Sequence, residues 1–345
     1  MTTSLKITVI MPAFNAGKYI AKAINSILSQ TLDDLELIVI NDGSTDDTFD
    51  LIKSFNDPRI ILIENETNIG IIQSSNKGLK LARGQYIALM DSDDISMPRR
   101  LEKQAYFLDT NHDIAACGSW ARIFGSVFGV AKTLTDSEEL AATFVFENMV
   151  INSSAMVRRD VLEREKLKYR DEFPHAHDYD LWARLSLSYK LYNLDEVLVK
   201  YRVHQSQDSQ KSAKLQRESA LRIKKYLLLS YGFSATEKDL AAHKCLTSYG
   251  VRLSEKTIDE VEQWLIKLTG ENEKIGKFNQ DKFRSIIEKY WKNFCIRDGN
   301  FGLTSFRRCI KSPLYLDKKS DLGIFSLLIL SFVYSAIIQL KRIKN

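Results

Sequence analysis

Two aspartates spaced two residues apart, Asp91 and Asp93, follow the apolar run 86–90. The run comes after Gly84 and ends abruptly in acid, which predicts a strand buried on both faces. Carboxylate oxygens are ligands for Mg²⁺ or Mn²⁺, and these ions take phosphate oxygens as further ligands. The pattern therefore favours a metal-dependent site for a nucleoside diphosphate. The alternative is that these acids only cap a helix beginning near Pro98.

The elements that would position these acids alternate along the first 90 residues. Apolar runs predict strands at 7–11, 35–40, 60–63 and 86–90, and helical spacing predicts helices between them, including 71–82. This alternation indicates a Rossmann-like, doubly wound, mostly parallel α/β sheet, which binds ligands at the carboxyl ends of its strands. Asp42 ends the second strand, where such sheets place an acid that contacts a sugar hydroxyl or base edge. Segment 41–47 also suits a turn leading to a helix cap.

Several protein classes are disfavoured by missing patterns. No Gly-x-Gly-x-x-Gly follows the first strand and no P-loop motif occurs, which argues against dehydrogenases and P-loop enzymes. The four cysteines are widely spaced and the five histidines form no metal-binding repeat, so we expect reduced thiols and no zinc site. No secretory signal precedes the first strand, which favours the cytoplasmic side of a membrane. A nucleic-acid partner is not expected.

The C-terminal end is basic and apolar. Residues 289–345 carry eleven Lys and Arg against three Asp, whereas the whole chain has a net charge of only +5. Residues 322–340 contain no charge, which is close to the 20 or so apolar residues that span a bilayer. Ser326, Ser331, Ser335 and Gln339 give this stretch one weakly polar side. We expect tail 321–345 to associate with the cytoplasmic membrane surface, lying on it or anchored in it. A terminal helix covering a soluble core is the alternative.

Five short segments also occur in a characteristic order, namely Val9–Asn15, Ser29–Thr31, Ile40–Asp46, Asn68–Gly70 and Leu89–Asp94. Together they resemble the N-terminal half of family 2 inverting glycosyltransferases of the bacterial surface-glycan type. The resemblance continues through His177–Trp182 and Tyr201–His204, and thus covers roughly residues 5–210.

The resemblance implies a GT-A fold and transfer of a sugar from a nucleotide donor, usually a UDP-sugar, to an acceptor hydroxyl. Asp93 would bind Mn²⁺ or Mg²⁺ directly, with Asp91 beside the ribose and metal and His204 near the metal or diphosphate. The donor-binding residues that it implies are Pro12, Ala13, Phe14, Asn15, Asp42, Asp91, Ser92 and Asp93.

Inverting transfer also needs a carboxylate on the opposite face, which removes the proton of the acceptor hydroxyl. Asp178 is the candidate, at the start of a helix predicted to run through Trp182. The family places its base in a Glu-Asp pair, but His177 stands where the Glu would be, so the orientation of Asp178 is open. Asp178 could instead be an N-cap, with Asp180 as the reserve base. Trp182 is either a core residue or a stacking surface for an acceptor sugar.

The sequence thus predicts a catalytic GT-A domain at 1–212, a helical C-terminal region at 213–320 and the membrane-associating tail at 321–345. The expected activity is metal-dependent transfer of one hexose or N-acetylhexosamine to a glycan or a lipid-linked oligosaccharide. We expect this reaction to serve surface polysaccharide or lipooligosaccharide synthesis, and to take place at the cytoplasmic face of the inner membrane. The alternatives are a nucleotidyltransferase acting on sugar phosphates and an inactive nucleotide-sugar binding module.

Overall fold

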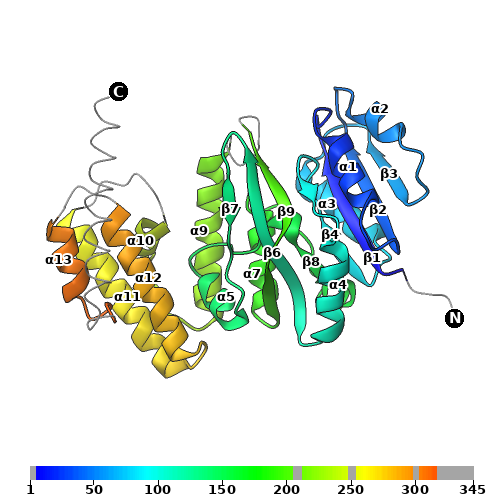
Figure 1. Ribbon diagram of the computed structural model, residues 1–345. Helices are drawn as coiled ribbons and strands as arrows, with labels where there is room; N and C mark the ends of the chain where they lie inside the picture. The colour runs from blue at the N-terminus through cyan, green and yellow to red at the C-terminus, as the bar shows by residue number, and fades with distance from the viewer. Residues whose placement is uncertain (1–4, 205–211, 248–253, 298–302, 317–345) are drawn as a thin grey trace, which may run out of the picture. The chain divides into compact units, whose positions relative to one another are not determined.

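The computed structural model describes residues 5–204, 212–247, 254–297 and 303–316 (Figure 1). Their strands form one nine-stranded sheet in the order β3-β2-β1-β4-β8-β6-β9-β5, with β7 paired to β6. The strands are β1 (Ile7–Ala13), β2 (Leu35–Asp42), β3 (Ile60–Asn65), β4 (Tyr86–Leu89), β5 (Ile95–Ser96), β6 (Ile114–Gly125), β7 (Gly129–Ala131), β8 (Met156–Arg158) and β9 (Lys190–Val203).

Twelve α-helices and one short 3-10 helix accompany the sheet in these residues. The helices are α1 (Ile20–Leu28), α2 (Thr48–Lys53), α3 (Ile71–Leu81), α4 (Arg100–Thr110), α5 (Ser137–Thr143), α6 (Arg159–Arg164), α7 (His177–Ser186), α9 (Ala213–Ser230), α10 (Glu237–Thr247), α11 (Glu255–Ile275), α12 (Gln280–Arg297) and α13 (Leu303–Lys311). The 3-10 helix is η1 (Asn152–Ser154).

The half of the sheet formed by β3, β2, β1 and β4 is parallel throughout. Side chains alternate between its two faces, so Val9 and Met11 share one core with α1 and α4. Ile10 lies on the other face under α3, where a Cβ at Gly78 would come within 2.5 Å of its side chain. Helices on both faces confirm the predicted doubly wound sheet. The strands β1, β2 and β3 each run two residues beyond the predicted end, into the loops of the candidate site.

The other half of the sheet is mixed. Antiparallel β8 joins β4 to β6, β6 runs parallel to β9, and β9 pairs antiparallel with the short β5. Since β5 directly follows the acidic loop after β4, this pairing brings the end of β9 beside that loop.

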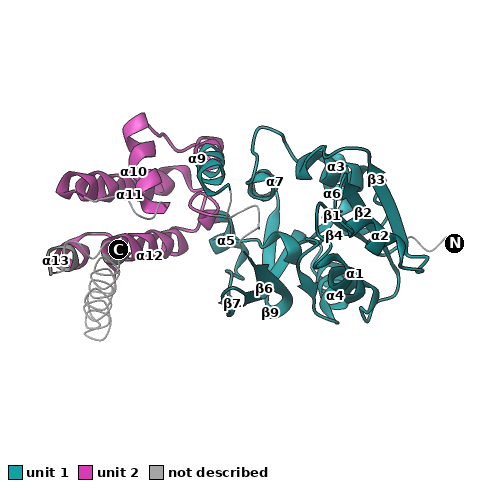
Figure 2. Ribbon diagram, turned by 90° about the horizontal axis from the view of Figure 1, so that it is seen from above, with its two compact units in different colours: residues 1–141, 148–223 teal, residues 142–147, 224–345 magenta. Residues whose placement is uncertain are grey.

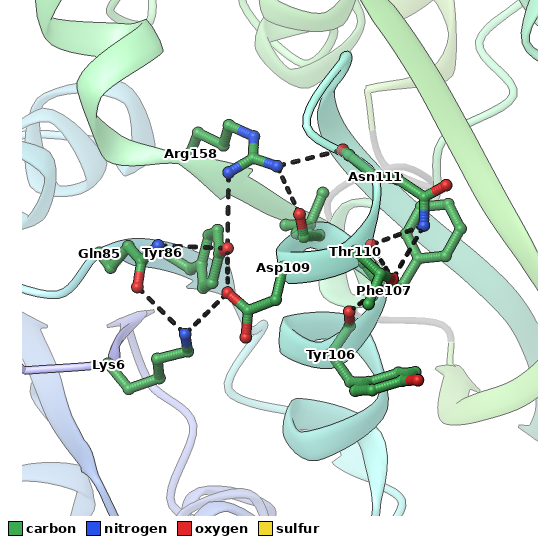
Figure 3. A network of polar contacts seen from close by, with 10 residues as sticks. Lys6, Gln85, Tyr86, Tyr106, Phe107, Asp109, Thr110, Asn111 and Arg158 are labelled. Carbon is green, nitrogen blue, oxygen red and sulfur yellow. Dashed lines mark hydrogen bonds and ion pairs between the residues drawn. The ribbon is translucent and has the colours of Figure 1, made fainter.

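A polar network fixes the sheet at the amino ends of its parallel strands, opposite the candidate site (Figure 3). The Lys6 ammonium and the Tyr86 hydroxyl donate to the Asp109 carboxylate at 2.8 and 2.7 Å. Arg158 donates to the Ile114 carbonyl at 2.9 Å, and so ties β8 to the start of β6. Burial and the Asp109 carboxylate raise the pKa of Tyr86, so this hydroxyl stays protonated and acts as a donor. The contacts hold α4 against β1 and β4.

The chain divides into two compact units (Figure 2). Unit 1 contains residues 1–141 and 148–223, and unit 2 contains 142–147 and 224–345. Unit 2 contains the helices α10, α11, α12 and α13, in keeping with the helical C-terminal region expected from the sequence. Trp264, Trp291 and Phe294 are buried within this unit and form its core.

The expected membrane-associating tail, 321–345, lies outside the described residues. Among the helices that are described, none combines the length and the apolar character needed to cross a bilayer.

Candidate functional site

The acidic loop after β4 lies at the carboxyl edge of the parallel strands, as predicted. The Asp91 Oδ1 atom accepts a hydrogen bond from the Asn152 amide at 2.9 Å, and Oδ2 accepts one from the Ser153 hydroxyl at 2.7 Å. Both partners belong to η1, which directly precedes β8. The helix α4 begins at Arg100 with Arg99 as its N-cap residue, so the alternative in which Asp91 and Asp93 cap this helix does not fit.

Residues at the end of β9 also contact the acidic loop after β4. The Asp93 carboxylate lies 2.9 Å from the His204 Nε2 atom. Arg202 donates through its side chain to the Asp93 carbonyl and through its backbone N–H to the Asp94 carboxylate, both at 2.7 Å. The structure thus joins Asp93 and His204, which are more than a hundred residues apart in the sequence. Ser92, between the two candidate ligands, is half-buried.

Burial makes this acidic cluster electrostatically costly. It raises the pKa of Asp91 to about 6, and the charges of Asp93 and Asp178 add to the effect, while the hydrogen bonds from Ser153 and Asn152 oppose it. Burial likewise raises the pKa of Asp94 well above its ordinary value, with Asp91 and Asp93 contributing. A bound cation would relieve the repulsion among these carboxylates.

The donor set at Asp93 and His204 fits a divalent ion. A carboxylate oxygen and an imidazole nitrogen in contact supply two ligands, and a nucleoside diphosphate and water would supply the rest. Within the described residues no group of three or more His, Cys, Asp or Glu side chains forms a complete metal cage.

A buried arginine, which the sequence interpretation missed, holds the backbone at the start of the acidic loop after β4. The Arg100 side chain is fully buried and donates to the carbonyls of Leu89 and Ala155 at 2.9 and 3.1 Å. Burial lowers its pKa to about 10, although nearby acids including Asp94 and Asp91 oppose the shift. Arg100 therefore fixes the end of β4 against the residue that precedes β8.

The loop after β1 is tied to the loop after β2. Asn15, whose φ is +49°, donates through its backbone N–H to the Ser44 hydroxyl at 3.0 Å. Its side-chain oxygen accepts the backbone N–H of Thr45 at 2.8 Å. Of the predicted donor-binding residues in this loop, Ala13 is buried and Pro12 half-buried, whereas Phe14 and Asn15 are exposed. Those two side chains are the ones available to a nucleotide.

Asp42 is buried, and its carboxylate is used by the chain itself. It accepts hydrogen bonds from the backbone N–H groups of Ile69 and Gly70, both at 3.0 Å, and from the Asn65 amide at 2.8 Å. The next residue, Gly43, has a φ of +65°. It packs closely on Thr67, and a Cβ added to Gly43 would lie 2.5 Å from the Thr67 backbone. The structure thus shows Asp42 positioning loop 68–70, while a direct nucleoside contact stays a prediction.

The candidate base Asp178 lies in the first turn of α7, whose N-cap residue is Ala176, so Asp178 is not the N-cap. The Asn148 amide donates to its Oδ2 atom at 3.0 Å. The same short segment, 148–153, also donates to Asp91, so it links the distant base candidate to the acidic loop. The His177 ring contacts the ring of Tyr169 edge to face, with centroids 5.3 Å apart. The Asn148 amide therefore orients the carboxylate.

Two other residues of α7 are structural. Asp180 is fully buried and paired with Arg170 and Arg184, so the reserve base does not face an acceptor. Trp182 is also fully buried, which corrects the alternative of a stacking surface for an acceptor sugar. Helical spacing alone could not separate the face of α7 that packs inward from the face that carries Asp178.

The sequence interpretation missed Asn148, Asn152 and Ser153, which hold both carboxylates. The available signal was local: the apolar residues 149–151 are followed by the polar run 152–154 just before a short strand. Polar residues next to a strand end are candidate loop donors, but nothing in the sequence pairs them with acids 30 and 61 residues away.

Comparisons with known proteins agree on one family. Residues 8–165 match the family model described as glycosyl transferase family 2. An uncharacterized glycosyltransferase of Haemophilus influenzae is 37% identical over 238 residues, which are 65% of this chain and 74% of the relative. The Escherichia coli relative WfaP, named as a UDP-Glc:alpha-D-GlcNAc-diphosphoundecaprenol beta-1,3-glucosyltransferase, is 32% identical over 57% of this chain and 77% of its own length.

A solved structure extends the likeness beyond the matched domain. Residues 1–349 of Staphylococcus aureus TarS, solved in complex with UDP-GlcNAc, align with a TM-score of 0.59 at 18% identity. The alignment covers 88% of this chain and 90% of that one. This likeness concerns the fold, and it confirms the expected GT-A architecture with a helical C-terminal region.

Proposed function

The chain belongs to glycosyltransferase family 2, and on this premise we propose that it transfers one sugar, with inversion, from a UDP-sugar to a hydroxyl of a lipid-linked glycan. One observation carries the proposal. Acids from two distant segments, Asp91 and Asp178, accept hydrogen bonds from the same short segment, 148–153. Donor diphosphate and acceptor hydroxyl must meet between two such acidic groups in a metal-dependent inverting transfer.

On the donor side, Asp93 and His204 would hold Mn²⁺ or Mg²⁺, with Asp91 adjoining. The ion supplies positive charge that stabilises the leaving diphosphate. The exposed side chains of Phe14 and Asn15 lie at the same strand edge, next to the loop that Asp42 holds in place. These groups are suited to contact the nucleoside, and Asp42 would set the position of the backbone around it.

On the acceptor side, Asp178 would take the proton from the attacking hydroxyl. The hydrogen bond from Asn148 fixes one carboxylate oxygen and leaves the other oxygen for the acceptor. The backbone N–H of Val150 donates to the Asn148 side-chain oxygen at 3.0 Å, which turns the amide nitrogen toward Asp178. The base is therefore oriented before the acceptor arrives.

The classes of donor and acceptor rest on the name of the E. coli relative, which uses UDP-Glc and a diphosphoundecaprenol-linked sugar. A lipid-linked acceptor also accords with the basic, apolar tail, which would hold the enzyme at the cytoplasmic face of the membrane. Assembly of a bacterial surface polysaccharide or lipooligosaccharide is the proposed setting. The comparisons favour a glycosyltransferase over a nucleotidyltransferase.

Release of UDP from a panel of UDP-sugars tests the proposal, with and without Mn²⁺ or Mg²⁺. Asp178→Asn should lower the rate by about 10²- to 10⁴-fold while UDP binding persists, and Asp93→Asn should weaken metal-dependent binding of UDP. The exposed Asp195→Asn is the matched control and should behave as the wild type.

Three results would count against this proposal. Release of pyrophosphate instead of UDP would indicate a nucleotidyltransferase. Tight binding of a UDP-sugar without any turnover would indicate a binding module. Wild-type rates in both Asp178→Asn and Asp93→Asn would contradict the assignment of the site.

A further inference from the structure

The hairpin formed by β6 and β7 carries apolar side chains into solvent at its turn. Val127 is 53% exposed, Phe128 84% and Val130 47%. We call residues 126–130 the hairpin tip. The tip is a single short turn between paired strands, and the hairpin can be followed in Figure 1. Three exposed apolar residues within four positions form a small apolar surface.

The charged residues within the hairpin itself are all basic. Residues 114–135 contain no Asp or Glu, and their charged residues are Arg122 and Lys132, one on each side of the tip. The Lys132 ammonium lies over the ring of Trp120, 4.9 Å from its centroid, so this cation is held near the hairpin. An apolar surface flanked by two cations is suited to the interfacial region of a bilayer that contains anionic lipids, where apolar side chains leave water and cations meet the negative headgroups.

Backbone pairing makes the hairpin tip rigid. The strands pair at Arg122 with Val130 and at Ile123 with Gly129, so little ordering is needed on binding. On the other side of β6, the Ser126 N–H donates to the Val203 carbonyl at 2.8 Å. Val203 directly precedes His204, the residue in contact with Asp93. The tip therefore begins beside the strand end that helps to form the candidate metal site.

We propose that the hairpin tip inserts into the interfacial region of an anionic lipid bilayer. The apolar surface is far smaller than the roughly 800 Å² that each partner buries in a stable protein interface, which disfavours a protein partner. Insertion would hold the donor site at the membrane surface, where a lipid-linked acceptor presents its hydroxyl. This membrane contact is independent of the tail and of the sugar-transfer chemistry, so its test does not depend on the proposed function.

The test uses the full chain and vesicles of phosphatidylcholine with or without phosphatidylglycerol. Phe128→Trp places a fluorescent probe at the tip, and Tyr106→Trp places one at an aromatic residue of α4 that is 70% exposed. On anionic vesicles, the tryptophan introduced by Phe128→Trp should shift to shorter wavelength and be quenched by brominated acyl chains. The tryptophan introduced by Tyr106→Trp should show neither effect.

Binding is measured in parallel by vesicle sedimentation. The double variant Val127→Ser with Phe128→Ser should bind anionic vesicles about tenfold or more weakly than the wild type, because two apolar side chains no longer leave water. Tyr106→Ser should not change binding. Equal quenching at positions 128 and 106, no quenching at 128, or a change in self-association without a change in vesicle binding would each overturn the proposal.

Discussion

Single hydrogen bonds hold the carboxylates of the candidate site in place. Asp91 is held by Asn152 and Ser153, and Asp178 by Asn148, all from one short segment that precedes β8. Segment 148–153 therefore determines the orientation of an acid on each side of the proposed reaction.

Asn148→Ala tests this positioning role. Removing a hydrogen bond to a carboxylate costs about 1.5–3 kcal/mol, so kcat should fall about tenfold or more. The KM for the UDP-sugar should change little, because the lost hydrogen bond is to Asp178 and not to Asp91 or Asp93. Steady-state kinetics with the best donor separates the two parameters. The exposed Asn56→Ala is the control, and a rise in donor KM with an unchanged kcat would contradict the role.

Residue types and spacing predicted the acidic residues of the candidate site, but they did not predict the side chains that position these acids. Asp91 and Asp93 were found because a buried strand ends in acid, and the resemblance supplied Asp178. Arg100 was missed because a charged residue at a helix start is ordinarily exposed, whereas here two backbone carbonyls satisfy it in the core. Such partners come from tertiary contacts, which no local pattern encodes.

In unit 2, α10 and α11 enclose a histidine that stays neutral. The fully buried His243 donates through Nε2 to the Val145 carbonyl at 2.8 Å and accepts the Trp264 indole N–H at 3.1 Å. Burial, with a contribution from Lys224, lowers the pKa of His243 to about 3. The unfolded chain, with its ordinary pKa of 6.5, therefore binds a proton over a pH range in which the folded chain does not.

Stability of unit 2 should accordingly fall as the pH decreases from about 6.5 toward 3, by at most about 1.4 kcal/mol per pH unit. Denaturant unfolding followed by tryptophan fluorescence measures this slope. His243→Gln should flatten it, whatever its effect on stability at neutral pH. The exposed His112→Gln should retain it, and an unchanged slope in His243→Gln would contradict the assignment.

Elements with strong periodicity were predicted well, and several of the others were missed. The parallel strands β1 to β4 and the helices α10 to α12 follow clear apolar patterns. β6 does not, since it combines Ala, Cys, Gly and Ser with Trp and Arg, and its pairing with β9 contains irregular register shifts. Short strands such as β8 leave too few residues for any period to appear.

For the whole molecule, the basic and apolar tail remains a prediction from sequence. Deleting residues 322–345 should lower the fraction of protein that sediments with membranes, because an uncharged stretch and its flanking cations are lost. Calorimetric titration should show unchanged UDP binding. Replacing Lys341, Arg342 and Lys344 by Gln is the matched variant and should give a smaller, salt-sensitive loss. Unchanged sedimentation of the deletion variant would exclude the anchor.

The grouping of the elements into two units could not be inferred from the sequence. Residues 142–147 lie between two segments of unit 1, yet they pack in unit 2, where the Phe146 ring stacks on His243 and Tyr290. This grouping depends on contacts with residues 97 and 144 positions later in the chain, so an apolar run alone gives no indication of it.

This short insertion restricts how the two units can be recombined. A chimera that exchanges only the residues after 223 would keep Phe144 and Phe146 of one protein inside the helical core of another. The mismatch would lie directly before Asn148, the residue that orients Asp178. Both pieces of unit 2 must therefore be exchanged together, so that residues 142–147 move with the C-terminal helices.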